Sequence, residues 1–265
     1  MWGIAQVADL ESIATELAAA YGSGQPTLAP LTSRYDGLTV DDAYAIQQLQ
    51  IGRRIAGGAS IVGYKAGLTS PAMQHQMGVY EPDFGHLLSD MVYPADAPID
   101  TASFRQPRAE PEIALILSRD LHGPGLSVAD VMTATACALP AIEIIDSRIT
   151  DWKIRLVDTV ADNASSGGLV LGQSPVPVGG RDLALAGCVM RKNGRIQATG
   201  AGAAVLGSPW HAATWLANTL TARGAQLNAG SIILTGSITA AVPVAAGDAV
   251  TVSIDGLGSV TAVFD

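Results

Sequence analysis

Cysteine and aromatic residues are scarce in this sequence of 265 residues. The two cysteines, Cys137 and Cys188, lie far apart and form no Cys-x-x-Cys pair, so neither a zinc knuckle nor a disulfide framework is indicated. Aromatic residues make up 5% of the chain and apolar residues 48%, so alanine, valine, isoleucine and leucine must fill the core. The length is sufficient for one large domain, or for one domain with a small appendage.

Positive charge is also sparse, because the net charge is -9 and no cluster of lysine and arginine occurs. Nucleic-acid binding depends on neutralising phosphates, so this class of partner is excluded. A protein of this charge that handles an anionic substrate needs a metal ion or a few well-placed cations. The low charged fraction of 15% beside the high apolar content indicates burial between subunits, so we expect a homo-oligomer.

Long apolar runs are missing as well. No uninterrupted run reaches the roughly 18 residues expected of a membrane span. The first residues, Met1 to Ala5, show no basic region followed by an apolar stretch. We therefore expect a soluble cytoplasmic protein whose partner is a small molecule.

Helical patterns dominate the first 60 residues. Apolar residues recur at helical spacing over 7–22, and Thr39 with Asp42 has the capping-box spacing that opens a second helix through Ile55. Further helices are predicted from Ser70 to Gly78, from Ser127 onward, and from Ser208 to Gly224.

Strand patterns dominate from residue 61, and Asn193-Gly194 is a strong hairpin signal between two of the runs. The predicted strands are 61–65, 110–118, 139–146, 168–172, 185–199, 231–235, 248–254 and 258–264. The pattern predicts an α+β protein with a helical N-terminal part, residues 1–60, and a β-rich catalytic domain, residues 61–265, as one continuous unit.

Three carboxylates stand out within the strand patterns. Glu110 and Glu112 are two residues apart, so both side chains face the same side of a strand, where they repel each other unless a cation lies between them. Glu143 is flanked by aliphatic residues, and such a glutamate is rarely buried unless it is paired or bound to metal. Pro111 cannot donate a ladder hydrogen bond, which predicts a strand edge or bulge with open space beside it.

These carboxylates allow two interpretations. Oxygen ligands without histidine or cysteine favour Mg²⁺ or Mn²⁺ over zinc. The alternative is two solvated strand carboxylates and one glutamate in a buried salt bridge. Asp146 and Arg148, also two residues apart, are expected to form a structural ion pair near this site.

Several sequence blocks follow one another in a specific order that covers nearly the whole chain. They are Gly63-Tyr64-Lys65-Ala66-Gly67-Leu68-Thr69-Ser70, Gly78-Val79-Tyr80-Glu81-Pro82-Asp83-Phe84-Gly85, Glu110-Pro111-Glu112-Ile113-Ala114, 142–154 and 158–167. The order resembles the hydratase/decarboxylase branch of the fumarylacetoacetate hydrolase superfamily. Within this branch, Asp151-Trp152-Lys153-Ile154 and residues 161–167 are similar to the 2-hydroxypenta-2,4-dienoate hydratases.

The resemblance implies a mixed β-roll or barrel of the fumarylacetoacetate hydrolase C-terminal-domain type. It implies homo-oligomers, commonly decamers, and a possible association with a sister enzyme. Lys65 and Asp83 match the catalytic residues of the family, and Glu110, Glu112 and Glu143 match its metal ligands. From the residues alone, Lys65 could also be a surface lysine and Asp83 a turn residue.

Five further residues are candidates for substrate binding: Leu68, Ser165, Ser166, Gly236 and Ser237. The two serines could hold a substrate carboxylate or cap a turn before the next strand. The segment around Gly236 matches the family only loosely.

The resemblance implies hydration of 2-hydroxypenta-2,4-dienoate, or of a substituted homologue, to a 4-hydroxy-2-oxo acid in the meta-cleavage catabolism of aromatic or steroid compounds. The first alternative is a 4-oxalocrotonate-type decarboxylase, which uses the same metal site. The second alternative is a non-catalytic partner subunit of a hydratase–decarboxylase complex.

Overall fold

The structure is a computed structural model that describes residues 9–21, 25–70, 74–75, 79–95 and 97–265. Most of the helix predicted from Ser70 to Gly78 lies outside these residues, as do residues 7, 8 and 22 of the first predicted helix. Within the described ranges, no helix is long and apolar enough to cross a membrane.

Two α-helices lie in the described part of residues 1–60, α1 (Leu10–Ala19) and α2 (Val40–Ala56). The predicted capping box at the start of α2 is present, because the Thr39 side chain accepts a hydrogen bond from the Asp42 N–H and the Asp42 side chain accepts one from the Thr39 N–H. Gln47 and Gln50 of α2 are buried and donate to backbone carbonyls of residues 84, 160 and 161. These bonds attach α2 to the strand β2 (Asp83–Leu88) and to the helix α5 (Leu156–Ala161).

The larger sheet has eight strands in the order β2-β1-β10-β5-β6-β7-β3, and β11 pairs with one end of β5. Its strands are β1 (Ile61–Gly67), β2 (Asp83–Leu88), β3 (Val92–Tyr93), β5 (Arg108–Leu117), β6 (Thr135–Ile145), β7 (Ser166–Leu171), β10 (Ile232–Leu234) and β11 (Val242–Pro243). The sequence pattern did not predict β2. All six of its residues are buried, so it lacks the alternation of apolar and polar residues that marks a half-exposed strand.

The smaller sheet has five strands in the order β4-β13-β12-β8-β9. Its strands are β4 (Pro98–Ile99), β8 (Gly187–Lys192), β9 (Arg195–Ala201), β12 (Ala249–Ile254) and β13 (Gly258–Phe264). The predicted hairpin joins β8 to β9, where Asn193 and Gly194 have φ angles of 52° and 77°. Positive φ at both positions is what a type I′ turn requires.

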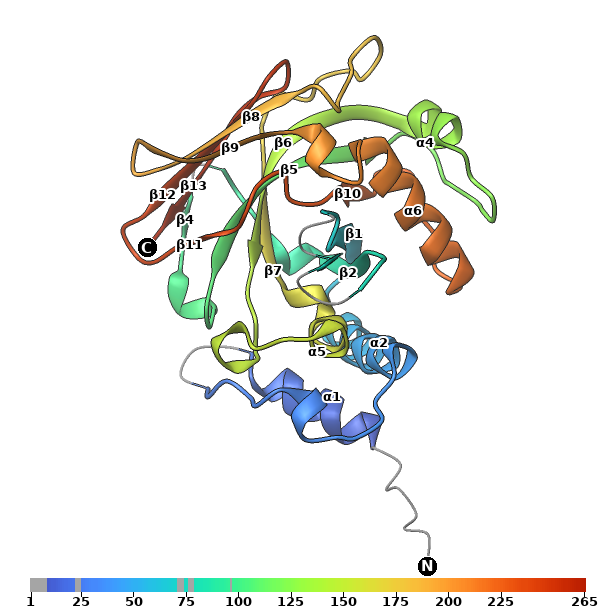
Figure 1. Cartoon of the computed structure of the whole chain (residues 1–265), viewed down its shortest axis with the longest axis vertical. Helices are drawn as coiled ribbons and strands as arrows, with labels where there is room; N and C mark the ends of the chain where they lie inside the picture. The colour runs from blue at the N-terminus through green and yellow to red at the C-terminus, as the bar shows by residue number, and fades with distance from the viewer. Residues whose placement is uncertain (1–8, 22–24, 71–73, 76–78, 96) are drawn as a thin grey trace, which may run out of the picture.

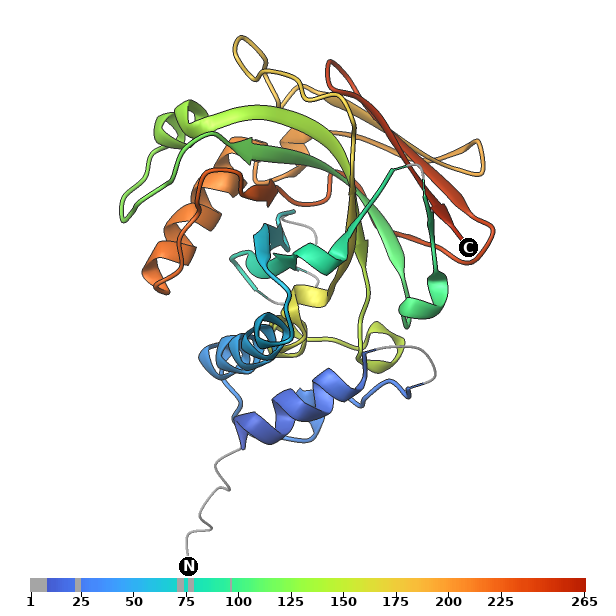
Figure 2. The same cartoon turned by 180° about the vertical axis from the view of Figure 1, so that it is seen from behind.

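In the described part of the chain, three more α-helices follow, α4 (Val128–Ala134), α5 (Leu156–Ala161) and α6 (Pro209–Ala222). Figure 1 shows α1, α2 and α5 together at one end of the molecule and the five-stranded sheet at the other. The view from behind gives the same arrangement, with the curved larger sheet between the two ends (Figure 2). The combination of two sheets and several helices confirms the predicted α+β class.

Candidate metal centre

The predicted carboxylates converge where β5 pairs with β6. Glu110 lies directly opposite Glu143 in the antiparallel register, and Glu112 follows two residues along β5 on the same face. One carboxylate oxygen from each residue lies within 4.8 Å of the others. Glu112 and Glu143 are each 1% exposed, so water does not screen their charges. The interpretation of Glu110 and Glu112 as solvated surface carboxylates is therefore wrong for Glu112.

The protein orients two of these carboxylates through only one oxygen of each. Glu112 Oε2 accepts a hydrogen bond from the Gly236 N–H at 2.8 Å. Glu143 Oε1 lies 3.4 Å from Lys65 Nζ and accepts from Ser166 Oγ at 3.4 Å. Glu112 Oε1 and Glu143 Oε2 are buried and have no hydrogen-bond partner among the described residues. Two fixed carboxylates that each offer an unpaired oxygen fit a hard divalent cation.

The pKa values of the carboxyls report the same crowding. Burial and the neighbouring Glu143 raise the pKa of Glu110 to about 8. Burial, Glu143 and Glu110 raise the pKa of Glu112 well above its ordinary value. Without a bound cation, Glu110 therefore holds a proton near neutral pH, and a divalent cation would replace that proton as the source of positive charge.

Lys65 lies on β1 and Asp83 on β2, two strands that pair with each other, and both side chains lie near the carboxylates. Lys65 is 4% exposed and Asp83 is 2% exposed, so neither is the surface or turn residue that the sequence alone allowed. Burial alone would lower the pKa of Lys65, but Glu143 and Asp83 raise it above its ordinary value. Lys65 is therefore a cation. Burial and Glu143 raise the pKa of Asp83, and its Oδ1 finds no hydrogen-bond donor in the described part of the chain.

Gly67 allows Asp83 to occupy this position. The two residues are directly opposite each other in the β1–β2 pair. A Cβ atom on Gly67 would lie 2.1 Å from Asp83 Oδ1 and 3.3 Å from Lys65 Nζ. Only glycine leaves this space free. Gly67 was not among the residues predicted for the site, although its position two residues after Lys65 places it on the same face of the strand.

The five residues predicted to bind substrate differ in their hydrogen-bond partners. Ser166 and Gly236 contact the carboxylates directly, as described above. The Ser165 hydroxyl instead pairs with Thr159 Oγ1 of α5 at 3.2 Å, and Ser237 Oγ donates to the Thr239 carbonyl. Leu68 is half-buried, directly follows β1 and has a left-handed φ of 53°. Their roles toward a substrate stay predictions.

Two structural expectations near the site require correction or refinement. Pro111 is not on an edge strand, because β5 lies inside the sheet and Pro111 pairs with Ile142 of β6. On its other side, Pro111 falls between the pairings of β5 with β10 and β11, where its carbonyl accepts from the Ile238 N–H. The proline is tolerated because the neighbouring strand is interrupted there.

The ion pair predicted between Asp146 and Arg148 is present at 3.8 Å. A closer partner of Arg148 is Asp162, which binds the Nε atom at 2.5 Å. Both Arg148 and Asp162 are completely or almost completely buried. Asp146 uses its carboxylate mainly to accept from the backbone N–H groups of Arg105 and Gln106.

A cavity of about 500 Å³ lies on the opposite face of β1 and β2. Its lining includes Tyr64, Phe84 and His86, which alternate along these strands with Lys65 and Asp83. Because successive side chains of a strand point to opposite faces, this cavity is separated from the carboxylates. We therefore place the candidate reaction site at the carboxylate cluster and not in this cavity.

Comparisons with known proteins agree with this site. The family model described as fumarylacetoacetate (FAA) hydrolase C-terminal matches residues 63–264, which include all five residues predicted to bind metal or act in catalysis. The 2-keto-4-pentenoate hydratase of Burkholderia vietnamiensis (strain G4 / LMG 22486) is 47% identical over 257 residues, which cover 96% of this chain and 97% of that protein. A 2-hydroxypent-2,4-dienoate hydratase of Pseudomonas putida is 51% identical over 73% of this chain and 88% of its own length.

A solved structure is similar over almost the whole length. It is the 4-oxalocrotonate decarboxylase from Pseudomonas putida G7, complexed with magnesium and adipate. The TM-score is 0.92 at 40% sequence identity, and the match covers 97% of each chain. The relatives therefore include both a hydratase and a decarboxylase.

Proposed function

Because the chain belongs to the fumarylacetoacetate hydrolase family, we propose that it is a hydro-lyase that adds water to 2-hydroxypenta-2,4-dienoate or a substituted homologue. The product is a 4-hydroxy-2-oxo acid, and the reaction belongs to the meta-cleavage catabolism of aromatic compounds. The observation that carries this assignment is the 47% identity to a 2-keto-4-pentenoate hydratase over almost the full length of both chains.

Glu110, Glu112 and Glu143 are the proposed ligands of a divalent cation, with Mg²⁺ or Mn²⁺ preferred for an oxygen-only site. The unpaired oxygens of Glu112 and Glu143 support this assignment. A bound cation would supply Lewis-acid stabilisation for negative charge that develops on the 2-oxo group of the substrate.

Asp83 is the proposed proton carrier, because its buried carboxyl has a raised pKa and its Oδ1 has no hydrogen-bond partner among the described residues. Lys65 keeps its positive charge beside Glu143 and is proposed to stabilise negative charge on the substrate. Gly67 has no Cβ atom, so the space beside Asp83 Oδ1 stays free for this proton transfer. The presence of all these groups argues against a non-catalytic partner subunit.

Decarboxylation is the second candidate function, and the position of Arg108 favours it. A decarboxylase for a dicarboxylic substrate has a second carboxylate to accommodate. Arg108 lies on the same strand as Glu110, its charge partly offsets the raised pKa of that carboxyl, and its guanidinium packs over the Trp152 ring at 4.5 Å. Arg148, by contrast, is already held by Asp162, and Lys153 pairs with Asp151 at the surface.

Incubation with each substrate separates the two activities. The protein is incubated with Mg²⁺ and either 2-hydroxypenta-2,4-dienoate or 2-oxohex-3-enedioate, and diene absorbance and CO₂ release are followed. We expect loss of the dienoate with formation of 4-hydroxy-2-oxopentanoate. Rapid CO₂ release from the diacid, with the dienoate unchanged, would overturn the hydratase assignment in favour of the decarboxylase.

Assembly is a further part of the proposal. The low charged fraction of 15% supports a homo-oligomer, and the family resemblance makes a decamer the expected state. Association with a sister enzyme of the same pathway is expected from the same resemblance. Sedimentation of the purified protein, alone and with such an enzyme, tests both.

A further inference from the structure

A left-handed turn lies directly before the strand that carries Ser166. Asn163, Ala164 and Ser165 have φ angles of 52°, 50° and 55°. This conformation is unfavourable for residues with a Cβ atom, and three in succession are rarely adopted without external support. Such strain persists only where surrounding contacts hold it, and it is concentrated at functional sites.

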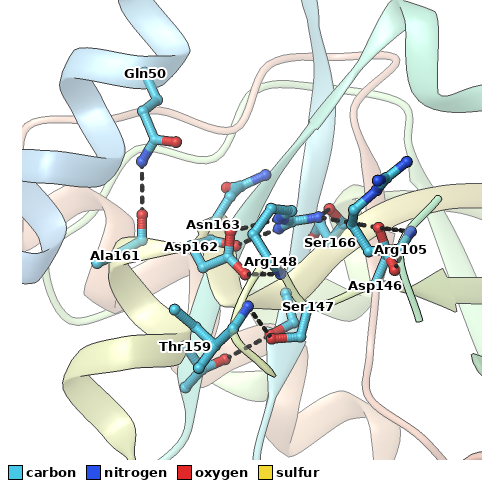
Figure 3. Close-up of polar contacts among 12 residues, drawn as sticks. Gln50, Arg105, Asp146, Ser147, Arg148, Thr159, Ala161, Asp162, Asn163 and Ser166 are labelled. Carbon is cyan, nitrogen blue, oxygen red and sulfur yellow. Dashed lines mark hydrogen bonds and ion pairs between the residues drawn. The ribbon is translucent and has the colours of Figure 1, made fainter. Parts of the chain in front are cut away.

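Arg148 holds both ends of this turn. Its Nη2 donates to the carbonyl of Asp162, before the turn, at 2.8 Å, and its Nη1 donates to the carbonyl of Ser166, after the turn, at 3.3 Å. Figure 3 shows the Arg148 side chain reaching between Asp162 and Ser166. The Tyr21 ring covers the guanidinium at 4.2 Å, and Arg148, Asp162 and Ser166 are each at most 1% exposed.

Asn163 fixes the other side of the turn to β2. Its side-chain Oδ1 accepts from the His86 N–H at 2.8 Å, and its Nδ2 donates to the His86 carbonyl at 2.9 Å. The amide therefore satisfies both backbone groups of His86, as a neighbouring strand would do.

Gly85 allows this close approach. A Cβ atom on Gly85 would lie 2.5 Å from the Asn163 carbonyl oxygen and 2.9 Å from Ser166 Oγ. Gly85 lies opposite Lys65 in the β1–β2 pair, so the turn packs against the face that carries Lys65. Ser166 then reaches Glu143 Oε1, which Lys65 also contacts.

We propose that Asn163 is a positioning residue that fixes Ser166 against Glu143 and thereby orients this carboxylate for a divalent cation. The inference rests on the proposed cation site but not on the identity of the substrate. The side-chain amide of Asn163 hydrogen-bonds to the His86 backbone and not to the carboxylates of the described cluster. Its effect passes through the turn and the Ser166 hydroxyl.

The test is a double-mutant cycle on Mn²⁺ affinity, measured by the electron paramagnetic resonance of free Mn²⁺ with the full-length protein. Asn163→Gly keeps a residue that tolerates the left-handed φ and removes only the amide bridge. Ser166→Ala removes the hydroxyl. Ala164→Gly is the matched control, because it changes the same turn without removing a hydrogen bond.

We expect Asn163→Gly and Ser166→Ala each to weaken Mn²⁺ binding about tenfold, as loss of a residue that orients a metal ligand commonly does. The double variant should also lose about tenfold, since both changes interrupt one path. The control should stay within about twofold of the wild type. If Asn163→Gly folds poorly, Asn163→Asp replaces it, because the second oxygen would face the His86 carbonyl without a proton to donate.

Two results would overturn the inference. One is wild-type Mn²⁺ affinity in Asn163→Gly, with only a lower melting temperature, which would make Asn163 a purely structural residue. The other is a roughly 100-fold loss in the double variant, which would show independent effects. Failure of the hydratase assignment is distinguishable, because it appears in the substrate assay and leaves this Mn²⁺ cycle unaffected.

Discussion

Binding of a divalent cation should depend strongly on pH, because Glu110, one of the proposed ligands, holds a proton near neutral pH when no cation is bound. Burial and Glu143 raise the pKa of Glu110 to about 8, so the cation must displace a proton from this carboxyl below that pH. One displaced proton makes the apparent affinity rise about tenfold per pH unit. From pH 6 to pH 8 the gain is therefore roughly 50-fold, or about 2.3 kcal/mol, because about half of the carboxyl is already ionised at pH 8. The raised pKa of Glu112 makes the dependence steeper.

The stability of the cation-free protein should change in the opposite direction. The folded pKa of Glu110, about 8, is above its ordinary value of 4.5. The folded state therefore binds more protons than the unfolded state between these values, and stability falls as pH rises through this window. Melting temperatures measured with EDTA should decrease from pH 5 to pH 8, and the stabilisation by added Mg²⁺ should increase.

Calorimetric titration with Mn²⁺ at pH 6, 7 and 8, in buffers of different ionisation enthalpy, gives the affinity and the number of protons released. Glu110→Gln is the control, because it should bind more weakly and lose about one proton from the pH dependence. A pH-independent affinity with no proton release would refute the reasoning. It would mean that Lys65 alone keeps the carboxylates ionised.

Three further predictions concern the residues around the cluster. Lys65→Ala should retain Mn²⁺ binding but lose at least about 100-fold in kcat, and near-native kcat at saturating substrate would show that Lys65 is structural. Gly67→Ala places a Cβ 2.1 Å from Asp83 Oδ1, so kcat should fall roughly 10- to 100-fold in a steady-state assay. An unchanged kcat would exclude Asp83 as the proton carrier. Arg148→Lys keeps the buried charge opposite Asp162 but loses the planar guanidinium, so urea denaturation should show that the free energy of unfolding falls by about 3 kcal/mol. A decrease of less than about 0.5 kcal/mol would contradict the role of the guanidinium hydrogen bonds.

Local features of the fold were readable from the sequence. The capping box at Thr39 and the hairpin at Asn193-Gly194 depend on residues within a few positions of each other, and both were confirmed. The common face of Glu110 and Glu112 follows from the two-residue period of a strand, and the structure places both in one cluster. These features need no knowledge of which strands become neighbours.

The order and register of the strands were decided only by the tertiary structure. Glu143 lies opposite Glu110 because β6 pairs with β5 in one particular register, and a shift by one residue would turn Glu143 to the other face. The strand β2 escaped prediction because it is buried on both faces, although it carries Asp83. Its pairing with β1 then places Asp83 opposite Gly67, which the sequence spacing does not indicate.

Long-range electrostatic partners were equally hidden. Asp146 was the expected partner of Arg148 because it is two residues away. The closer contact comes from Asp162, which directly follows α5. Lys65 becomes a buried cation only because Glu143 and Asp83 arrive from other strands. The sequence determined which chemical groups this protein carries and which face of each strand they occupy, because both depend on short-range geometry. The tertiary structure decided which groups meet, because burial and strand pairing bring together residues that are distant along the chain.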